Sequence, residues 1–202
     1  MDVKLPKTAN DLRIQHFKAF NEWNEDGMET MDKARFISAF TGKHINIVLA
    51  MDNDMFEKMY NHALTIISKL KINASPPKEI TMRGIEYVMI NPDKTSAGWH
   101  MDWGNVVKES GYEKDPVKVA CLFYHPKGHF YGEVDSNSNL VHPIRDKYDV
   151  FKKEMPLSIF IECSRFFLLK LVRSTITSTE KKIWERRTVK FLTRIKLLRG
   201  KK

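Results

Sequence analysis

Apolar side chains recur at helical spacing in three successive runs within the first 71 residues. The first run follows a cap at Thr8 or Asn10 and carries Leu12, Ile14, Phe17 and Phe20. The second run opens at Thr30, ends at Gly42 and carries Met31, Ala34, Ile37 and Phe40. The third follows a cap at Asp52 or Asn53 and carries Phe56, Met59, Tyr60, Ala63, Ile66, Ile67 and Leu70. Residues 1–72 are therefore predicted to form an N-terminal helical unit.

The helical pattern stops at a polar segment that contains two adjacent prolines. Pro76 and Pro77 lack backbone donors and restrict the residues before them, so residues 73–79 are predicted to be a linker. The apolar positions from Ile80 to Ile90 then read as extended and end at the turn signal Asn91-Pro92-Asp93. We expect a second extended piece from Trp99 to Trp103.

Helical patterns return in the second half of the chain. Pro116 suits the first position of a helix whose inward side chains are Val119, Ala120, Leu122 and Phe123. A polar run between His125 and Pro143 predicts a long loop or a hairpin. Pro156 opens an apolar helix that is expected to reach Leu171. Residues 80–175 are therefore predicted to form a mixed α+β unit.

The chain closes with a predicted basic amphipathic helix over residues 176–202. A capping box at Thr177-Ser178-Thr179-Glu180 opens it, and Gly200 ends it. One face is an apolar stripe that we expect to contact a partner: Trp184, Phe191, Ile195 and Leu198. The basic residues beside it are expected to face a polyanion: Lys181, Lys182, Arg186, Arg187, Lys190 and Arg194. The fold class predicted for the whole chain is α+β and mostly helical.

Charge is distributed very unevenly along the 202 residues. Residues 165–202 hold 13 basic and two acidic residues, a net charge of +11, whereas residues 1–164 hold 21 basic and 23 acidic residues, a net charge of −2. A local excess of this kind favours a polyanion such as DNA, or an acidic protein surface, as partner. A solvated helix that only aids solubility and a helix that binds an anionic membrane surface both stay open as alternatives.

Residues with metal-binding or nucleophilic chemistry are few. His125, His129 and His142 lie near Cys121, but their spacing matches no common zinc site, so we interpret them as ordinary loop histidines. Cys121 and Cys163 fall on apolar helix faces, where burial raises thiol pKa values and makes the thiols inert. No phosphate-binding motif occurs, and no cofactor is expected.

An enzymatic alternative depends on His100 and Asp102. On an extended segment, side chains two residues apart share a face, so this pair could act together in acid–base chemistry. A structural hydrogen bond beside Trp99 and Trp103 explains the same residues, and we favour it. No membrane span is expected, because charged residues interrupt the longest apolar stretch, Leu157 to Val172. The N-terminus has no apolar run of the kind found in secretory signals.

The order of short motifs resembles that of small structural or tail-assembly proteins of tailed bacteriophages, namely crAss-like and other large phages of Bacteroidetes hosts. The resemblance covers most of residues 5–172. In the first half it rests on Leu5-Pro6-Lys7-Thr8 with Asp11-Leu12, on Phe36 to Gly42, on Ile47 to Leu49 and on Phe56 to Leu70. In the second half it rests on Ile85-Glu86-Tyr87, Gly98-Trp99, Asp102-Trp103, Pro116 to Tyr124, Arg145, Met155-Pro156 and Phe166-Phe167-Leu168.

This resemblance implies a non-enzymatic subunit of the virion, made in the host cytoplasm, with no catalytic residues. One implied role is a ring or connector protein between portal and tail, assembled as a homo-oligomer against neighbouring portal, ring or tail proteins. DNA is a further candidate partner, through the C-terminal helix. The other is a tail-assembly chaperone that leaves before the particle is complete. A basic nucleic-acid-binding module outside any virion is a third hypothesis, and the basic terminal helix is compatible with it.

Overall fold

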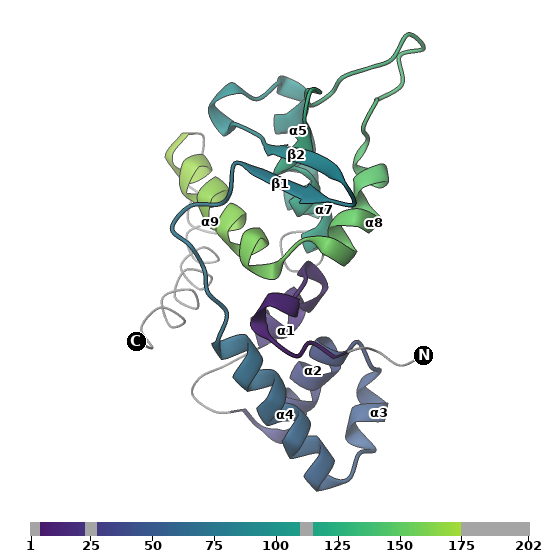
Figure 1. Cartoon of the computed structure of the whole chain (residues 1–202), viewed down its shortest axis with the longest axis vertical. Coiled ribbons are helices and arrows are strands. Elements are labelled where there is room, and N and C mark those ends of the chain that lie inside the picture. The colour runs from purple at the N-terminus through teal and green to yellow at the C-terminus, as the bar shows by residue number, and fades with distance from the viewer. Residues whose placement is uncertain (1–4, 23–27, 110–114, 175–202) are drawn as a thin grey trace.

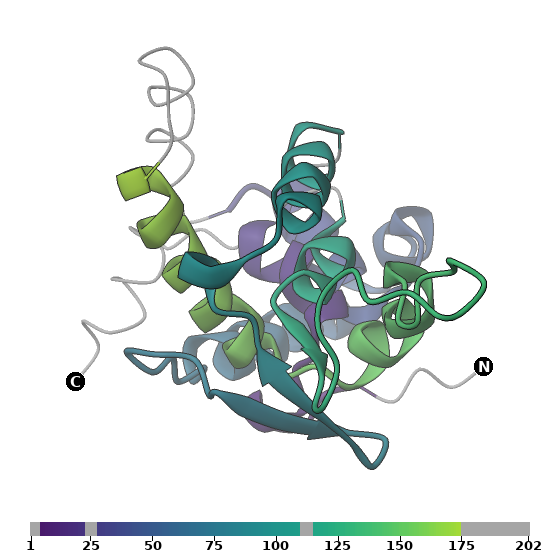
Figure 2. The same ribbon diagram turned by 90° about the horizontal axis from the view of Figure 1, so that it is seen from above.

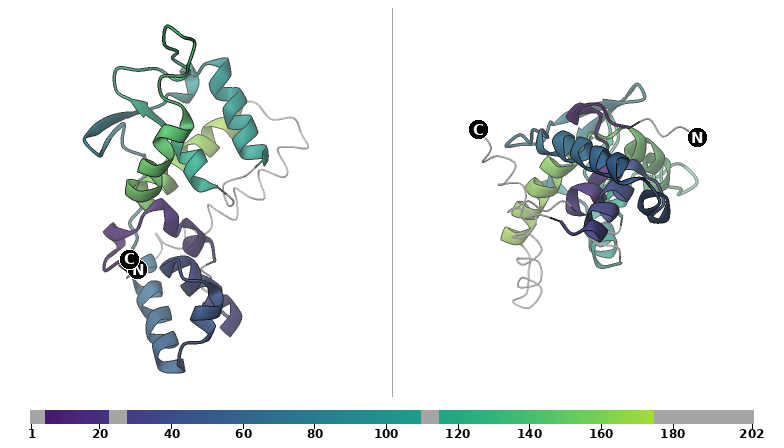
Figure 3. Two further views of the ribbon diagram at one scale, coloured as in Figure 1. Left: turned by 90° about the vertical axis from the view of Figure 1, so that its right-hand side faces the viewer. Right: turned by 90° about the horizontal axis from the view of Figure 1, so that it is seen from below.

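The computed structural model describes residues 5–22, 28–109 and 115–174 (Figure 1). The predicted C-terminal helix over residues 176–202 lies outside these ranges. The described part is mostly helical with one small antiparallel sheet, so the expected α+β class is confirmed. Its helices α2, α3 and α4 form one end of an elongated molecule, and the sheet with helix α5 lies toward the other end (Figure 3).

Two of the three helical runs predicted near the N-terminus fold as expected. Helix α2 spans Thr30–Thr41 and ends at Gly42, whose φ of 69° is the left-handed conformation that favours glycine. Helix α4 spans Asn53–Ser68, and the Asp52 side chain caps it by accepting a hydrogen bond of 2.9 Å from the Met55 amide. A short helix, α3 (Ile45–Leu49), lies between them and was not predicted.

The first run is not one helix but three short pieces: the 3₁₀ turns η1 (Ala9–Asp11) and η2 (Ile14–His16), and helix α1 (Phe17–Glu22). The prediction of a continuous helix is wrong because Leu12 and Arg13 are extended. Their backbone pairs instead with the chain around Pro156: the Ile14 amide donates to the Met155 carbonyl at 3.1 Å, and the Leu157 amide donates to the Leu12 carbonyl at 3.1 Å. The N-terminal segment is thereby joined to the second half of the chain.

The extended run after the prolines folds into a hairpin of two strands, β1 (Glu79–Met82) and β2 (Ile85–Met89). Arg83 and Gly84 form its turn with φ values of 49° and 74°, the left-handed pair that two-residue hairpins prefer. A third strand, β3 (Tyr124–Pro126), pairs antiparallel with β2 and completes the sheet in the order β1-β2-β3. A 3₁₀ turn, η3 (Pro92–Lys94), then leads to α5.

The segment from Trp99 to Trp103 is helical, so the prediction of an extended piece there is wrong. Helix α5 spans Ala97–Glu109, and the two indoles stack one helical turn apart with ring centroids 5.4 Å from each other. Three further helices follow in the described part of the chain: α7 (Pro116–Cys121), α8 (Ile144–Glu154) and α9 (Leu157–Ser174). Helices α7 and α9 follow the predictions, whereas α8 was not predicted.

An aromatic core holds α5, α7 and α9 together. Phe123 and Phe167 stack with centroids 4.7 Å apart, and Trp103 packs against both rings. Phe160 joins the cluster at 6.0 Å from Phe123. Viewed from above, α9 lies on one side of the molecule and the long connection after β3 projects from the other (Figure 2). Phe123 of this core lies directly before β3, from whose end that connection starts.

Candidate functional site

The residues predicted from sequence to contact partners lie outside the described ranges. These are the apolar stripe of Trp184, Phe191, Ile195 and Leu198 and the basic residues Lys181, Lys182, Arg186, Arg187, Lys190 and Arg194. Their roles stay predictions. The described residues offer three other surfaces: a projecting loop, a helical corner and a pocket.

The projecting loop is residues 127–143, which we call the arm; it connects β3 to α8 and extends from the body of the molecule (Figure 1). An antiparallel bridge between Val134 and Leu140 closes its outer part into a narrow hairpin. The Asp135 carboxylate organises the tip by accepting hydrogen bonds of 2.8 and 2.9 Å from the amides of Asn137 and Asn139. These amides hold the pKa of Asp135 below its usual value. The predicted long loop or hairpin is confirmed.

The root of the arm is fastened to helices α5 and α8. The Tyr131 hydroxyl donates to the Asp102 carboxylate on α5, and burial together with this carboxylate raises the pKa of Tyr131. The Lys147 ammonium on α8 lies 5.7 Å from the Tyr131 ring and donates to the carbonyls of Cys121 and Tyr124. Lys147 is buried, and burial lowers its pKa. The arm therefore projects from a well-anchored base.

Exposed apolar side chains mark this arm. Phe130, Val134 and Leu140 are 68%, 54% and 53% exposed. Single exposed hydrophobic residues are ordinary, but three within eleven positions of an otherwise polar loop are a feature of surfaces that contact other molecules. The sequence pattern predicts only a polar loop here. The signal that identifies it is the set of apolar residues placed between its turn residues.

A second apolar surface lies where α3 meets α4, at the end of the molecule away from the sheet (Figure 3). We call it the α3–α4 corner, formed by Ile47, Leu49 and Met55, which are between 44% and 54% exposed. Asp52 and Asp54, both exposed, lie beside them at the start of α4. Residues 44–56 contain no lysine or arginine, so the corner is apolar and acidic.

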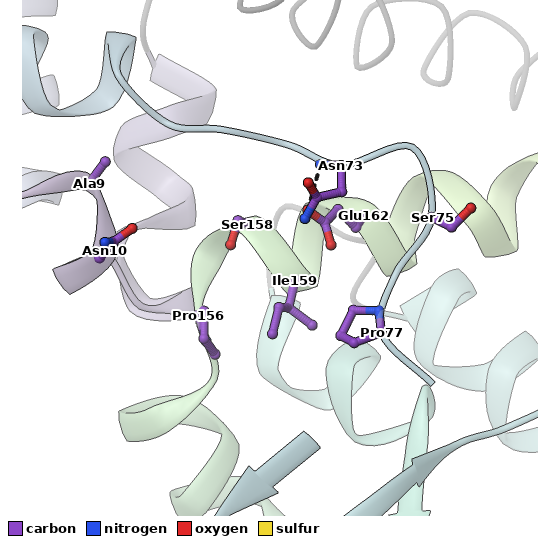
Figure 4. A pocket seen from close by; sticks show the side chains of 9 residues that line it. All are labelled: Ala9, Asn10, Asn73, Ser75, Pro77, Pro156, Ser158, Ile159 and Glu162. Atoms are coloured by element: carbon purple, nitrogen blue, oxygen red, sulfur yellow. Dashed lines mark hydrogen bonds between the residues drawn. The ribbon is translucent and has the colours of Figure 1, made fainter. Parts of the chain in front are cut away.

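A pocket of about 550 Å³ lies where three separate segments meet (Figure 4). Its lining comes from η1, from the segment after α4 and from the start of α9: Ala9, Asn10, Asn73, Ser75, Pro77, Pro156, Ser158, Ile159 and Glu162. The buried Glu162 carboxylate accepts a hydrogen bond of 2.6 Å from the Asn73 amide. The described lining holds one carboxylate and no histidine, cysteine or lysine, so this carboxylate fastens the connecting segment rather than pairing with a second catalytic group.

The two residues of the enzymatic alternative are not brought together. On helix α5, His100 and Asp102 are two positions apart and point to different faces. His100 Nε2 lies 2.8 Å from the Thr95 hydroxyl, whereas Asp102 accepts from Tyr131. The expectation that they share a face is wrong because the segment is helical. Each side chain instead has a structural partner of its own.

His129 and His142 lie on the arm, whereas Cys121 and Cys163 lie in the buried core. His129 lies 2.9 Å from the Glu133 carboxylate, and its ring packs against that of His142. Among the described residues, no cluster of three or more His, Cys, Asp or Glu side chains is arranged to hold a metal ion. Burial raises the pKa of both Cys121 and Cys163 to about 12, so neither thiol is a nucleophile near neutral pH.

Within the described ranges, none of the helices combines the length and hydrophobicity that crossing a bilayer demands.

Comparison with known proteins assigns this chain to no family. No protein-family model matches the sequence, and neither the curated proteins nor the solved structures contain a significant match to this chain.

Proposed function

We propose that this protein is a non-enzymatic structural subunit of a tailed-phage particle, assembled as a ring or connector between portal and tail. The observation that carries this proposal is the arm, in which an anchored base presents Phe130, Val134 and Leu140 to solvent. A closed ring is built from heterologous contacts, so each subunit presents two different faces to its neighbours. The arm and the α3–α4 corner lie at opposite ends of the molecule and differ in chemistry, so they suit different neighbours (Figure 3).

The catalytic alternatives have less support in the described residues. His100 and Asp102 have separate partners, both thiols are buried, and the pocket carries one carboxylate that is already bonded to a backbone amide. A role in assembly needs none of these groups to react. It needs exposed apolar anchors on a stable frame, because a few buried apolar anchors provide most of the energy of an interface.

Two measurements test the proposal. The sedimentation mass of the purified protein, alone and with portal or tail components, is expected to exceed that of a 23.7 kDa monomer. The variant Phe130→Ser is expected to lower incorporation into particles about tenfold, because one lost anchor of about 1.4 kcal/mol changes a binding constant tenfold. Met101→Ser, at a position on α5 that is 67% exposed, is the matched control and is expected to incorporate normally. A protein absent from purified mature particles would instead be the assembly chaperone.

A nucleic-acid-binding module is the second candidate, favoured by the +11 charge of residues 165–202. The two functions predict opposite orders of effect. For a ring subunit, Trp184→Ala abolishes incorporation, and charge reversal at Arg186 and Arg187 weakens it in a salt-sensitive way. For a nucleic-acid binder, the reversals abolish DNA binding that falls steeply with salt, and Trp184→Ala affects mainly stability. A protein that stays monomeric with phage components, yet binds duplex DNA at micromolar concentration in physiological salt, would overturn the ring.

A further inference from the structure

The α3–α4 corner has a composition that selects its partner. Ile47 and Leu49 on α3 and Met55 in the first turn of α4 are each close to half exposed, whereas Val48 between them is fully buried. Val48 therefore fixes the short helix to the core, and Ile47 and Leu49, each about 100° from it around the helix axis, leave apolar side chains exposed on its two flanks. Asp52 and Asp54 add negative charge to the same turn. An apolar surface bordered by carboxylates fits a segment that is both apolar and basic.

This chain contains such a segment. Residues 175–202 hold ten basic and two acidic residues, a net charge of +8, together with Trp184, Phe191, Ile195 and Leu198. The described residues 5–22, 28–109 and 115–174 together hold 22 basic and 19 acidic residues, a net charge of only +3. The terminal segment and the corner are thus complementary in charge and alike in apolar character.

The position of the α3–α4 corner relative to the end of α9 favours a contact between two copies of the chain. Helix α9 ends at Ser174, on the side of the molecule that carries α5, whereas the corner lies at the opposite end (Figure 1). The sequence predicts a helix over residues 176–202, and 27 helical residues would span about 40 Å, a length that can bridge to a neighbouring copy. A tail that binds the corner of the following copy repeats the same heterologous contact around a ring.

We infer that residues 175–202 of one copy bind the α3–α4 corner of a neighbouring copy. This inference rests on the proposed ring, in which the molecule bound at the corner is another copy of this chain. It adds the surface to which residues 175–202 bind. The apolar stripe covers Ile47, Leu49 and Met55, and the basic residues face Asp52 and Asp54. Because charges contribute at the edge of this contact, the association weakens as salt rises.

A photo-crosslinking experiment on the full-length protein tests the contact directly. A photoreactive phenylalanine analogue replaces Ile47, and equal amounts of ¹⁴N- and ¹⁵N-labelled protein are mixed before illumination. We expect mass spectrometry to find crosslinks from position 47 to residues 175–202 in pairs of mixed isotope. The same analogue at Met101, also exposed, is the matched control and is expected to give no such crosslink. Crosslinks confined to one isotope, or leading from position 47 to any other segment, would overturn the inference.

A complementation test separates this inference from the proposed function. The corner variant Ile47→Ser with Met55→Ser and the tail variant Trp184→Ala are each expected to lose self-association about tenfold. An equal mixture retains one intact corner and one intact tail, so it is expected to form a dimer that grows no further. Circular dichroism checks that each variant folds. Corner variants that assemble like the unmodified protein would overturn the contact and leave the ring standing, whereas unmodified protein absent from particles would overturn the ring itself.

Discussion

The indole N–H of Trp99 on α5 donates a hydrogen bond of 2.9 Å to the backbone carbonyl of Leu122, directly after α7. Both residues are fully buried, so water cannot replace the indole as donor. Trp99→Phe is therefore expected to lower the free energy of unfolding by about 1–3 kcal/mol, the cost of an unsatisfied buried carbonyl. Urea denaturation followed by circular dichroism measures this. Met101→Ala, on the exposed side of the same helix, is expected to change stability by less than about 0.5 kcal/mol, and equal midpoints for the two variants would contradict the prediction.

The same tryptophan shows why sequence reasoning failed at α5. Trp99, Met101 and Trp103 alternate with polar residues, a pattern typical of a strand, but Trp99 and Trp103 also lie four residues apart on one helical face. Two glycines, Gly98 and Gly104, lower the helical propensity further. The aromatic core around Phe167 selects the helix, and that core is a tertiary property that no local window contains.

Other elements were predicted because their signals are local. The Asp52 cap and the apolar face of α4 lie within one stretch of sequence, as do Gly42 and the end of α2. Helix α8 was not predicted because it is strongly polar and buries only Lys147, Val150 and Phe151. The arm was predicted as a loop, but its exposed apolar side chains were not predicted to form a surface. Their exposure depends on the fold that holds the base of the arm.

His16 makes stability depend on pH. Burial lowers its pKa from the ordinary value of 6.5, and its Nδ1 accepts a hydrogen bond of 2.9 Å from the Arg13 amide, which requires this nitrogen to be unprotonated. The unfolded chain therefore binds a proton that the folded chain does not. We expect stability to fall as the pH decreases from about 7 to about 5.

Urea denaturation at several pH values measures the His16 contribution. The variant His16→Asn keeps an acceptor for the Arg13 amide but cannot titrate, so its stability is expected to vary less with pH over this range. His142 is the matched control. Partial burial also lowers its pKa, but most of its surface is exposed, so His142→Asn is expected to retain most of the dependence of stability on pH. A slope unchanged in His16→Asn would refute this assignment.

The two cysteines are expected to be unreactive in the folded protein. Both are fully buried, and burial raises their pKa to about 12. At about pH 8, a thiol reagent such as 5,5′-dithiobis(2-nitrobenzoic acid) is expected to label neither residue within minutes and to label both in urea. Rapid native labelling of Cys163 would show that α9 opens far more easily than its aromatic packing indicates.

The segment predicted as a linker is held down by side chains from the second half of the chain. Pro76 is buried, and the Tyr124 hydroxyl donates a hydrogen bond of 2.7 Å to the Pro77 carbonyl. Tyr124→Phe removes that bond and is expected to speed tryptic cleavage at Lys78 several-fold, because cleavage requires the local backbone to open. Limited proteolysis with mass spectrometry measures it. Tyr131→Phe, the matched control, frees the root of the arm and is expected to leave the rate at Lys78 unchanged.

The backbone pairing of Ile14 with Met155 has a consequence for how the chain is synthesised. The two residues are about 140 positions apart, and a ribosome adds about 5–20 residues each second. The N-terminal segment therefore waits roughly 7 to 30 seconds for its partner. During that interval Leu12, Ile14 and Phe17, all buried in the finished fold, have no completed core to enter. Emergence of the segment around Pro156, rather than of the first helices, therefore sets the moment at which the N-terminus folds.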